Sequence, residues 1–339
     1  MSKTGNKQIL FAERPTGAPT AATFELADTA MPEPGEGEFL VRNIFMSVDP
    51  YMRGRMVDTK SYIPGFQIGE PLEAGAVGEV IKSNHEKIKV GDHVLSLLGW
   101  REYYVTDGKG IGKIDPKVAP IQHYLGLLGM PGLTAYVGLL DLGTPKEGET
   151  VFVSSAAGAV GMLVGQIAKI KGCRVVGSAG TDEKVKFLTE ELGFDAAFNY
   201  RGADYDAVLK ELCPKGIDIN FENVGGPQMD AVMRRMRANG RVILCGLIDQ
   251  YNDPENPTSS LGPVSTVLFN RLMIKGFIVL DHYDRMPAFH ADAAKWLAAG
   301  QIKYPETVVD GIENAPQAFL DLMAGKGFGK MLVRIGPDA

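Results

Sequence analysis

The sequence is poor in cysteine. Among its 339 residues only Cys173, Cys213 and Cys245 are cysteines, and no two of them stand at the spacing of a metal-binding pair. Three thiols cannot build a disulfide framework, and this usage is typical of proteins from a reducing compartment. We therefore expect a cytoplasmic protein without disulfides.

An excess of positive charge and a long apolar run are missing as well. The chain has 35 Lys and Arg against 41 Asp and Glu, which gives a net charge of −6, and it has no basic block, so nucleic acid is disfavoured as a partner. The most apolar region, residues 124–143, is interrupted by Pro131 and contains Asp141, which favours packed helices over a membrane span. The first residues show no signal-peptide pattern. We expect neither a membrane partner nor secretion.

Core-forming residues, in contrast, are plentiful. Hydrophobic residues make up 45% and charged residues 22% of the sequence, and the length suggests roughly two domains. Residues 1–120 hold short β-rich runs separated by Gly and Pro, at 38–48, 73–83 and 92–106. Closely spaced strands of this kind predict a small barrel or sandwich.

From about residue 123 the pattern changes to strands that alternate with helices. Such alternation predicts right-handed β-α-β units around a parallel sheet. The expected strands are 151–155, 174–180, 196–200, 217–225, 241–248 and 272–281, and the expected helices are 159–171, 182–192, 204–213, 227–238 and 287–300.

The loop and the tail that follow have a separate character. Residues 250–263 hold three prolines, and a loop of this length in a compact domain is often a functional lid or disordered. The tail predicts one more helix and a closing strand, KMLVRI, which add no new β-α unit and so return to the first domain. We place the β-rich domain at 1–127 and 300–339, and the parallel-sheet domain at 128–299.

The turn AAGAVG follows the first strand of the alternating region and opens a helix. Gly158, Ala159, Val160 and Gly161 occupy the place of a Gly-x-Gly-x-x-Gly/Ala loop, where small residues let the backbone approach a pyrophosphate. The bare pattern is weak, but its position between strand and helix makes it specific. The alternative is close helix–strand packing without a ligand.

The end of the second strand favours NADP over NAD. An NAD site usually has Asp or Glu there for the ribose hydroxyl, whereas this strand ends with Ser178 and Gly180. Lys184 follows closely, and Tyr200 and Arg201 end the next strand. Neutral residues with nearby cations suit a 2′-phosphate. The alternative for Lys184 is an ordinary solvated charge.

The order of the two domains resembles the medium-chain dehydrogenase/reductase superfamily, which combines a GroES-like β-rich domain with a Rossmann domain. Its zinc alcohol dehydrogenases carry a Cys and a Gly-His-Glu in the first domain. This chain reads FMSVDPYMR at 45–53 and IPGFQIGE at 63–70, without those ligands, and lacks the four-cysteine lobe. Zinc cannot be held without such ligands, so we expect no metal.

Several further blocks resemble one zinc-free branch, the prostaglandin reductase and leukotriene hydroxydehydrogenase family, with plant alkenal double-bond reductases and bacterial curcumin reductase. They are SVDPYMR, GMPGLTAY, AAGAVG, GSAGTDEK, FNY, ENVGG and CGLIDQYN. The resemblance covers nearly the whole chain. It implies NADPH-dependent reduction of the carbon–carbon double bond of an α,β-unsaturated ketone or aldehyde, with hydride going to the β carbon. It also implies a homodimer.

The resemblance further implies a set of site residues. Tyr51 becomes a wall of the substrate pocket, although Asp49 and Pro50 before it also read as an ordinary helix start. Where the family has Asn near its C-terminal end, this chain has Gly327, whose backbone is the remaining cofactor contact. The other cofactor-binding residues are Gly158, Ala159, Val160, Gly161, Gly180, Lys184, Tyr200, Asn223, Cys245, Gly246, Ile248, Phe277, Ile278 and Val279.

Tyr251 is the candidate catalytic residue. Hydride addition leaves an enolate, and a hydrogen-bond donor to its oxygen lowers the barrier. A phenol with a pKa of about 10 can donate at neutral pH. Alternatives are a loop tyrosine that only packs, or the ribose hydroxyl of the cofactor as donor. We propose no chemistry for the thiol of Cys245, which also reads as a small buried hydrophobe.

Two other functions remain open at this point. One is a zeta-crystallin-like quinone reductase, also zinc-free and NADPH-linked, against which SVDPYMR and the Tyr251–Asn252 pair argue. The other is a non-catalytic NADP-binding sensor or structural subunit.

Overall fold

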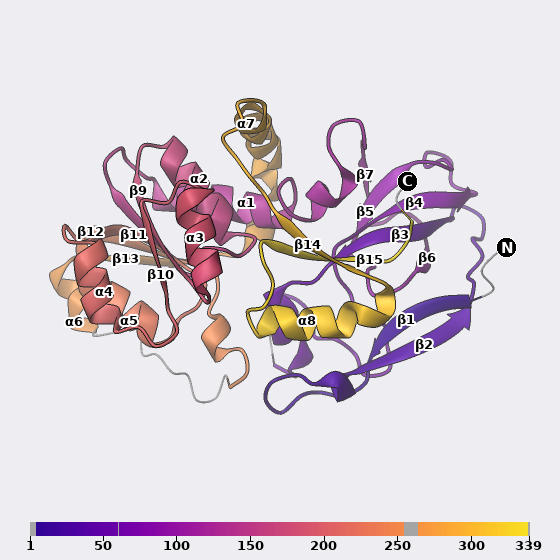
Figure 1. The fold of residues 1–339 in the computed structure, drawn as a ribbon. Helices are drawn as coiled ribbons and strands as arrows, with labels where there is room; N and C mark the ends of the chain where they lie inside the picture. The colour runs from indigo at the N-terminus through magenta and orange to yellow at the C-terminus, as the bar shows by residue number, and fades with distance from the viewer. Residues whose placement is uncertain (1–4, 60, 254–263, 338–339) are drawn as a thin grey trace. The chain divides into compact units, whose positions relative to one another are not determined.

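A computed structural model describes residues 5–59, 61–253 and 264–337 of the chain. It separates into two compact units, residues 1–126 with 306–339 and residues 127–305 (Figure 1). These bounds put residues 300–305 with the second unit rather than the first. Each unit is described by itself below.

The first unit is built on a mostly antiparallel sheet with β3 at its centre, in which only β14 and β15 pair in parallel among the described strands. Seven strands form this sheet in the order β14-β15-β3-β4-β5-β7, with β6 also paired to β3, and β1 and β2 form a separate hairpin. The strands are β1 (Gly5–Phe11), β2 (Phe24–Ala30), β3 (Phe39–Ser47), β4 (Ala76–Ser83), β5 (His93–Ser96), β6 (Tyr103–Thr106), β7 (Gly112–Ile114), β14 (Glu306–Asp310) and β15 (Lys330–Arg334).

Short helices complete the first unit. They are the 3₁₀ helices η1 (Ala21–Thr23), η2 (Pro50–Met56), η3 (Ile121–Leu125) and η7 (Ile312–Asn314), and the α-helix α8 (Ala315–Met323). β15 pairs with β3 through Leu332 and Ser47, so the tail of the chain is part of this sheet.

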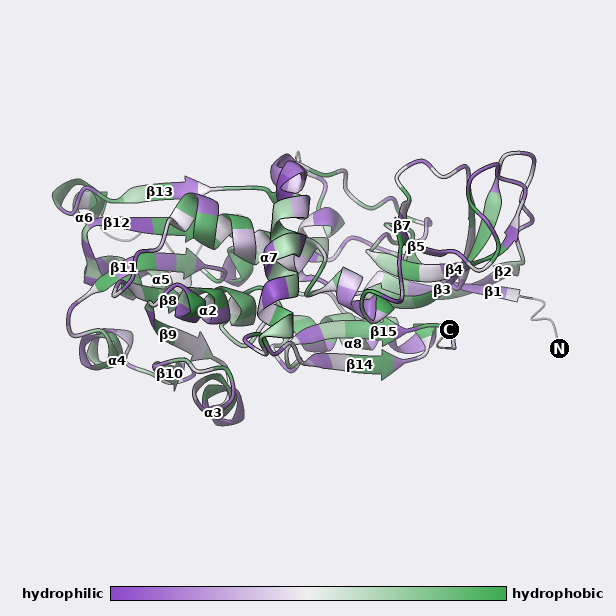
Figure 2. Cartoon of the chain, turned by 90° about the horizontal axis from the view of Figure 1, so that it is seen from above, coloured by the Kyte–Doolittle hydropathy of each residue, from purple (hydrophilic) through white to green (hydrophobic). Residues whose placement is uncertain are grey.

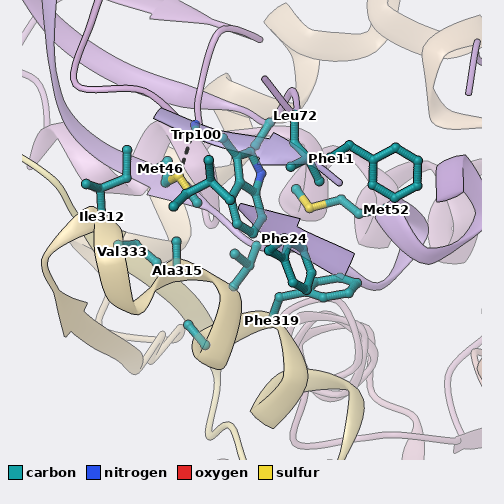
Figure 3. Close-up of a cluster of buried hydrophobic side chains, with 14 of the residues drawn as sticks. Phe11, Phe24, Met46, Met52, Leu72, Trp100, Ile312, Ala315, Phe319 and Val333 are labelled. Atoms are coloured by element: carbon teal, nitrogen blue, oxygen red, sulfur yellow. Dashed lines mark hydrogen bonds between the residues drawn. The ribbon is translucent and has the colours of Figure 1, made fainter. Parts of the chain in front are cut away.

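Trp100 lies at the centre of the core of the first unit. Its ring stacks on Phe24 at 5.7 Å, and Phe319 of α8 meets Phe24 edge-on (Figure 3). The backbone amide of Trp100 donates to the sulfur of Met46 on β3, 3.2 Å away. A helix from the tail therefore covers a core formed by the N-terminal strands.

A buried ion pair joins β15 to the end of β3. The Nζ of Lys330 donates to Oδ1 of Asp49 at 2.9 Å and to Oγ of Ser47 at 2.6 Å, and Lys330 is only 1% exposed. The Ser47 hydroxyl in turn bonds to Asp49. Asp49 does precede η2 with Pro50 in its first turn, as the sequence predicts, but its carboxylate binds Lys330 instead of capping the helix.

The second unit is a parallel sheet in the order β10-β9-β8-β11-β12-β13. Its strands are β8 (Thr150–Val153), β9 (Arg174–Ala179), β10 (Ala196–Asn199), β11 (Ile217–Glu222), β12 (Met236–Leu244) and β13 (Met273–Gly276). The chain builds outward from β8 to β10 and then crosses back to β11. The strand order therefore reverses between β8 and β11, as in doubly wound folds.

Helices cover both faces of this sheet. α4 and α5 lie side by side on one face (Figure 1), where Phe152, Leu209 and Val232 share a buried cluster. The mostly hydrophobic α2 (Figure 2) and η4 pack on the other face. The helices are α1 (Met130–Tyr136), the π-helix η4 (Val137–Gly143), α2 (Gly161–Ile170), α3 (Asp182–Glu190), α4 (Tyr205–Leu212), α5 (Gly226–Arg235), η5 (Ile248–Gln250), α6 (Val264–Phe269), η6 (Val279–Arg285) and α7 (Met286–Ala298).

The expected fold class, a β-rich domain with a Rossmann domain, is confirmed, but some elements have other bounds. The strand expected over 272–281 ends at Gly276, because its neighbour β12 ends at the paired Leu244 and offers no ladder further on. The helix expected over 227–238 ends at Arg235, where Met236 turns to extended backbone and starts β12. In the loop expected over 250–263, residues 254–263 lie outside the described residues.

The apolar region 124–143 forms η3, α1 and η4 rather than one long helix. None of the described helices is long and apolar enough to cross a membrane.

Candidate active site

The carboxyl ends of β8 and β11 meet where the strand order reverses. In open parallel sheets, ligands bind outside the strands' carboxyl ends at such a position. Ser154 follows β8, and Glu222 ends β11. The hydroxyl of Ser154 donates to Oε1 of Glu222 at 2.6 Å, so one hydrogen bond spans the reversal point.

The turn after β8 is tightly wound. Ser155 has a left-handed φ of 50°, and Gly158 bonds back to its carbonyl. A Cβ on Gly161 would lie 2.4 Å from the Ser155 carbonyl oxygen, so no larger residue fits there. Helix α2 then begins at Gly161, as the sequence pattern predicts to within two residues.

Among the described residues, the backbone amides of Ala159, Val160 and Gly161, just before and at the start of α2, form no backbone hydrogen bond. The amide of Met162 already bonds to the carbonyl of Gly158, and the amide of Val164 bonds to that of Val160. The first amides of any helix have no acceptor within it, and they carry the positive end of the helix dipole. The turn thus fits a pyrophosphate, because small residues let the ligand approach these unbonded amides at the positive end of α2.

The end of β9 forms a second part of the site. A Cβ on Gly180 would lie 2.9 Å from the hydroxyl of Tyr200, so the tyrosine lies directly over this glycine. Thr181 caps α3 by accepting from the amide of Lys184 at 3.2 Å, which fixes the first turn of α3 beside it. Burial lowers the pKa of Lys184, and the charge of Arg201 lowers it further. Two cations therefore flank a strand end that has no carboxylate of its own.

Glu222 organises the segment ENVGG beyond β11. Its Oε1 accepts from the amides of Val224 at 2.8 Å and Gly225 at 3.0 Å. Asn223, which lies between Glu222 and Val224 in the chain, donates through its side-chain amide to the Ser154 carbonyl at 2.8 Å. Gly225 has a φ of 83°, a left-handed conformation that glycine adopts without strain.

Tyr251 lies beside the same segment. Its hydroxyl is 3.3 Å from where a Cβ of Gly246 would stand, and the carbonyl oxygen of Asn223 is 3.2 Å from that point. Ile248 begins η5, whose last turn places Tyr251 through a hydrogen bond between the two residues. The structure thus brings together Asn223, Gly246 and Tyr251.

Cys245 directly follows β12, and its thiol is protonated. Burial raises its pKa to about 12, and the nearby charge of Glu222 contributes to the shift. A thiol is nucleophilic only as its thiolate, so the environment supports the reading of Cys245 as a packing residue.

The remaining predicted residues fall into separate places. Phe277, Ile278 and Val279 follow β13 in the second unit, and Phe277 packs against Gly138 of η4. Tyr51 and Gly327 belong to the first unit: Tyr51 lies in η2 against the core, and Gly327 lies between α8 and β15.

Ser154, Asn220 and Glu222 are not among the residues that the sequence patterns predict for the site. All three are fully buried and hydrogen-bonded to one another through Glu222. A signal was present in IDINFE, where polar residues occupy every second position of a strand with no exposed face. In the part of the chain that is described, no group of three or more His, Cys, Asp or Glu residues could hold a metal ion.

Comparison with known proteins defines the class of this protein. Residues 7–114 match the N-terminal domain of oxidoreductase family, and residues 159–295 match the family described as zinc-binding dehydrogenase. The second family is named for zinc binding, but the described part of this chain holds no group of three or more His, Cys, Asp or Glu residues that could bind a metal ion.

Individual relatives narrow the class to one branch. The chain is 44% identical to the NADPH-dependent curcumin reductase of Escherichia coli and 42% identical to the 2-alkenal reductase (NADP⁺-dependent) of Nicotiana tabacum, with 99% of each chain covered in both cases. The crystal structure of CurA in complex with NADPH from Vibrio vulnificus superposes with a TM-score of 0.93 at 46% identity, over 98% of this chain and all of that one. The chain belongs to the medium-chain dehydrogenase/reductase family, in the branch of the curcumin, alkenal and prostaglandin reductases.

Proposed function

We propose that this protein uses NADPH to reduce the carbon–carbon double bond of α,β-unsaturated ketones and aldehydes. Several relatives that match over 94–99% of the chain are named for curcumin, 2-alkenal, pulegone and prostaglandin reduction. The observation that carries the proposal is the Tyr251 hydroxyl beside Gly246 and Asn223, at the edge of the sheet where the phosphate turn also lies. A donor and a dinucleotide cradle there meet the two needs of enone reduction.

The proposed cofactor site extends from the phosphate turn to the end of β12. The amides at Ala159, Val160 and Gly161 would hold the pyrophosphate, and Lys184 with Tyr200 would hold the 2′-phosphate. NADPH, when bound, supplies the hydride that adds to the β carbon. The other residues proposed to contact the cofactor are Gly158, Gly180, Asn223, Cys245, Gly246, Ile248, Phe277, Ile278, Val279 and Gly327.

Tyr251 is proposed to act on the substrate carbonyl. As negative charge develops on the carbonyl oxygen, the phenol donates a hydrogen bond to it and stabilises the enolate. The α carbon then takes its proton from solvent. Tyr51 of the first unit is proposed as a wall for the substrate, which makes the β-rich domain the substrate domain and the parallel-sheet domain the NADP-binding domain.

Steady-state assays with four substrates test the function. An alkenal, an aryl enone, a prostaglandin-like enone and a quinone would each be mixed with NADPH and the purified protein. We expect saturated carbonyl products from the enones and the enal, identified by mass spectrometry, and little NADPH oxidation by the quinone. An allylic alcohol as product would mean carbonyl reduction and would contradict the proposal.

The same assay separates the alternative functions. The quinone oxidoreductase of Escherichia coli has a similar structure at 19% identity, a likeness that concerns the fold alone. Preferred turnover of the quinone would favour that activity. NADPH binding without turnover of any of the four compounds would favour a non-catalytic sensor.

A homodimer in the cytoplasm is proposed as the working state. β13 is an edge strand of the parallel sheet, and α6 beside it exposes large apolar side chains, with Leu268 73% and Phe269 71% exposed. Open strand edges and apolar patches pair readily with a second copy. Light scattering would give twice the mass of the 36.6 kDa chain, and Phe269→Glu with Leu268→Lys should give the mass of one chain.

A further inference from the structure

Glu222 is a buried carboxylate whose partners are all neutral groups. It is fully buried and accepts hydrogen bonds from the Ser154 hydroxyl, the amides of Val224 and Gly225, and the side-chain amide of Asn220 at 3.0 Å. The Ser154 hydroxyl itself accepts from the amide of Asn223 at 2.8 Å, which leaves its proton to donate to Glu222. Every partner thus donates, as an ionised carboxylate requires.

The charge of Glu222 has no cation to balance it. Asp49 in the first unit is paired with Lys330, whereas no lysine, arginine or histidine of the described residues forms an ion pair with Glu222. Burying a carboxylate costs several kcal/mol, and hydrogen bonds offset only part of this cost. The positive end of α5, which begins at Gly226, stabilises the charge further. An amide in the same place would satisfy the same turn without that cost.

The position of the Glu222 carboxylate relates its charge to dinucleotide binding. Glu222 lies at the reversal point between β8 and β11, where a doubly wound sheet binds its dinucleotide, and it holds the proposed cofactor residue Asn223 in place through Ser154. Of the two forms of the dinucleotide, only NADP⁺ carries a positive charge on the nicotinamide ring. A fixed negative charge at this edge attracts that form more than NADPH.

Resting on the proposed function, we propose that Glu222 is a positioning residue whose negative charge favours NADP⁺ over NADPH in the site. The charge of Glu222 would then assist hydride donation, because it would stabilise the positive charge left on the nicotinamide ring when the hydride passes to the β carbon of the substrate and solvent supplies the proton to the α carbon. A purely structural Glu222 would support both forms equally.

The test compares the affinities of the two forms in the absence of substrate. Titration calorimetry gives the dissociation constants of NADP⁺ and NADPH for the wild type and for Glu222→Gln. The variant is isosteric, and Oδ1 of Asn220 has no partner in the described structure, so an amide flip of Asn220 can accept the new NH₂ group. We expect the dissociation constant of NADP⁺ to rise by about ten-fold relative to that of NADPH, because the variant loses the attraction between the carboxylate and the positive nicotinamide ring.

Two further variants separate charge from positioning. Ser154→Ala removes the hydroxyl and keeps the carboxylate, so it should weaken both forms by the same factor. The exchange Asn220→Asp with Glu222→Gln keeps one carboxylate and one amide on the same face of β11 and should recover most of the wild-type ratio. These controls distinguish loss of the charge from loss of the network.

Each outcome decides the proposal. A shifted ratio in Glu222→Gln that the exchange restores supports it. An unchanged ratio, with or without equal weakening of both forms, overturns it, and so does a Glu222→Gln chain that no longer folds, because the carboxylate would then serve the fold. Wild type that binds neither dinucleotide would contradict the proposed function itself, which sets that failure apart from a failure of the charge proposal.

Discussion

Lys184 on α3 and Arg201 beyond β10 present like charges to the same strand end. Burial lowers the pKa of Lys184, and the charge of Arg201 adds to the shift. The charge of Glu183 opposes these shifts in part, and a phosphate bound beside both cations would offset their repulsion further. We propose that this pair binds the 2′-phosphate, the group that distinguishes NADPH from NADH.

Lys184→Ala should raise the apparent constant for NADPH by roughly ten-fold or more, since a hydrogen bond to a charged group contributes about 1.5–3 kcal/mol. The constant for NADH, which lacks the 2′-phosphate, should change little. Initial-rate kinetics with both cofactors measure the two effects. Lys186→Ala is the matched control, because Lys186 lies on the same helix in an exposed pair with Glu190. Equal efficiency of the wild type with NADPH and NADH would contradict the preference.

Tyr251→Phe should lower turnover far more than it weakens NADPH binding. Loss of one oxyanion donor costs about a hundred-fold or more in many enzymes, and we expect a smaller loss here because the ribose hydroxyl of the cofactor can share the role. The ring is kept, so the packing beside Gly246 should survive. Deuteride from labelled NADPH should appear on the β carbon of the product. Unchanged turnover would remove Tyr251 from the mechanism, and label on the carbonyl carbon would show another reaction class.

Chelation should leave both folding and turnover unchanged. Zinc needs three or four thiolate, imidazole or carboxylate ligands at one point, and the described residues offer no such group. Prolonged dialysis against a chelator, followed by thermal unfolding and enone assays, measures the effect. Stoichiometric zinc in the purified protein, lost together with activity, would contradict this prediction.

Lys330→Met should destabilise the first unit by about 3–5 kcal/mol, because it leaves the carboxylate of Asp49 buried without its cation. The chain has two tryptophans, and Trp100 lies in the core of the first unit while Trp296 lies in the second. In a Trp296→Phe background, urea unfolding followed by fluorescence reports on Trp100 alone. Lys326→Met, which breaks an exposed pair with Asp321, is the control and should cost less than about 1 kcal/mol. Equal effects of the two variants would contradict the assigned role of the buried pair.

Alkaline conditions should destabilise the protein in part through Tyr104. Burial raises the pKa of Tyr104 to about 12. A raised folded-state pKa means that its contribution to stability is complete below the unfolded value near 10 and is lost as the pH rises toward 12. Tyr104→Phe should remove about 2 kcal/mol of this loss in the free energy of unfolding. The denaturation midpoint of the variant should therefore fall less steeply than that of the wild type as the pH rises from about 10 to about 12. Tyr62→Phe at an exposed position should leave the slope as in the wild type. A slope in Tyr104→Phe as steep as that of the wild type would contradict the prediction.

The sequence predicted the elements whose causes are local. The phosphate turn needs small residues in consecutive positions, and the alternation of strands and helices follows from short-range periodicity, so Gly158, Gly161 and the order of β8 to β12 could be read directly. The end of β13 could not, because it depends on where the neighbouring strand stops pairing.

Contacts between segments that are distant in the chain could not be predicted from the sequence either. Ser154 and Glu222 are 68 residues apart, and only the parallel register of β8 and β11 brings the hydroxyl to the carboxylate. Tyr251 is predicted through the family resemblance, but its place beside Gly246 follows from the short helix η5, which the sequence patterns do not predict. The polar residues at every second position of the buried strand β11 indicate that Glu222 has a role inside the fold, but the sequence does not show which residues bind it.

The pairing of Lys330 with Asp49 also orders events during synthesis. The two residues are 281 positions apart, and translation at about 5–20 residues per second separates them by roughly 15–60 s. Phe319, which covers Phe24, is likewise made long after it. The second unit is one continuous segment and can complete its core within that interval, while the nascent first unit still lacks its closing strand and its buried cation. For that period the half-made sheet around β3 is the part of the chain that a ribosome-bound chaperone would have to shield.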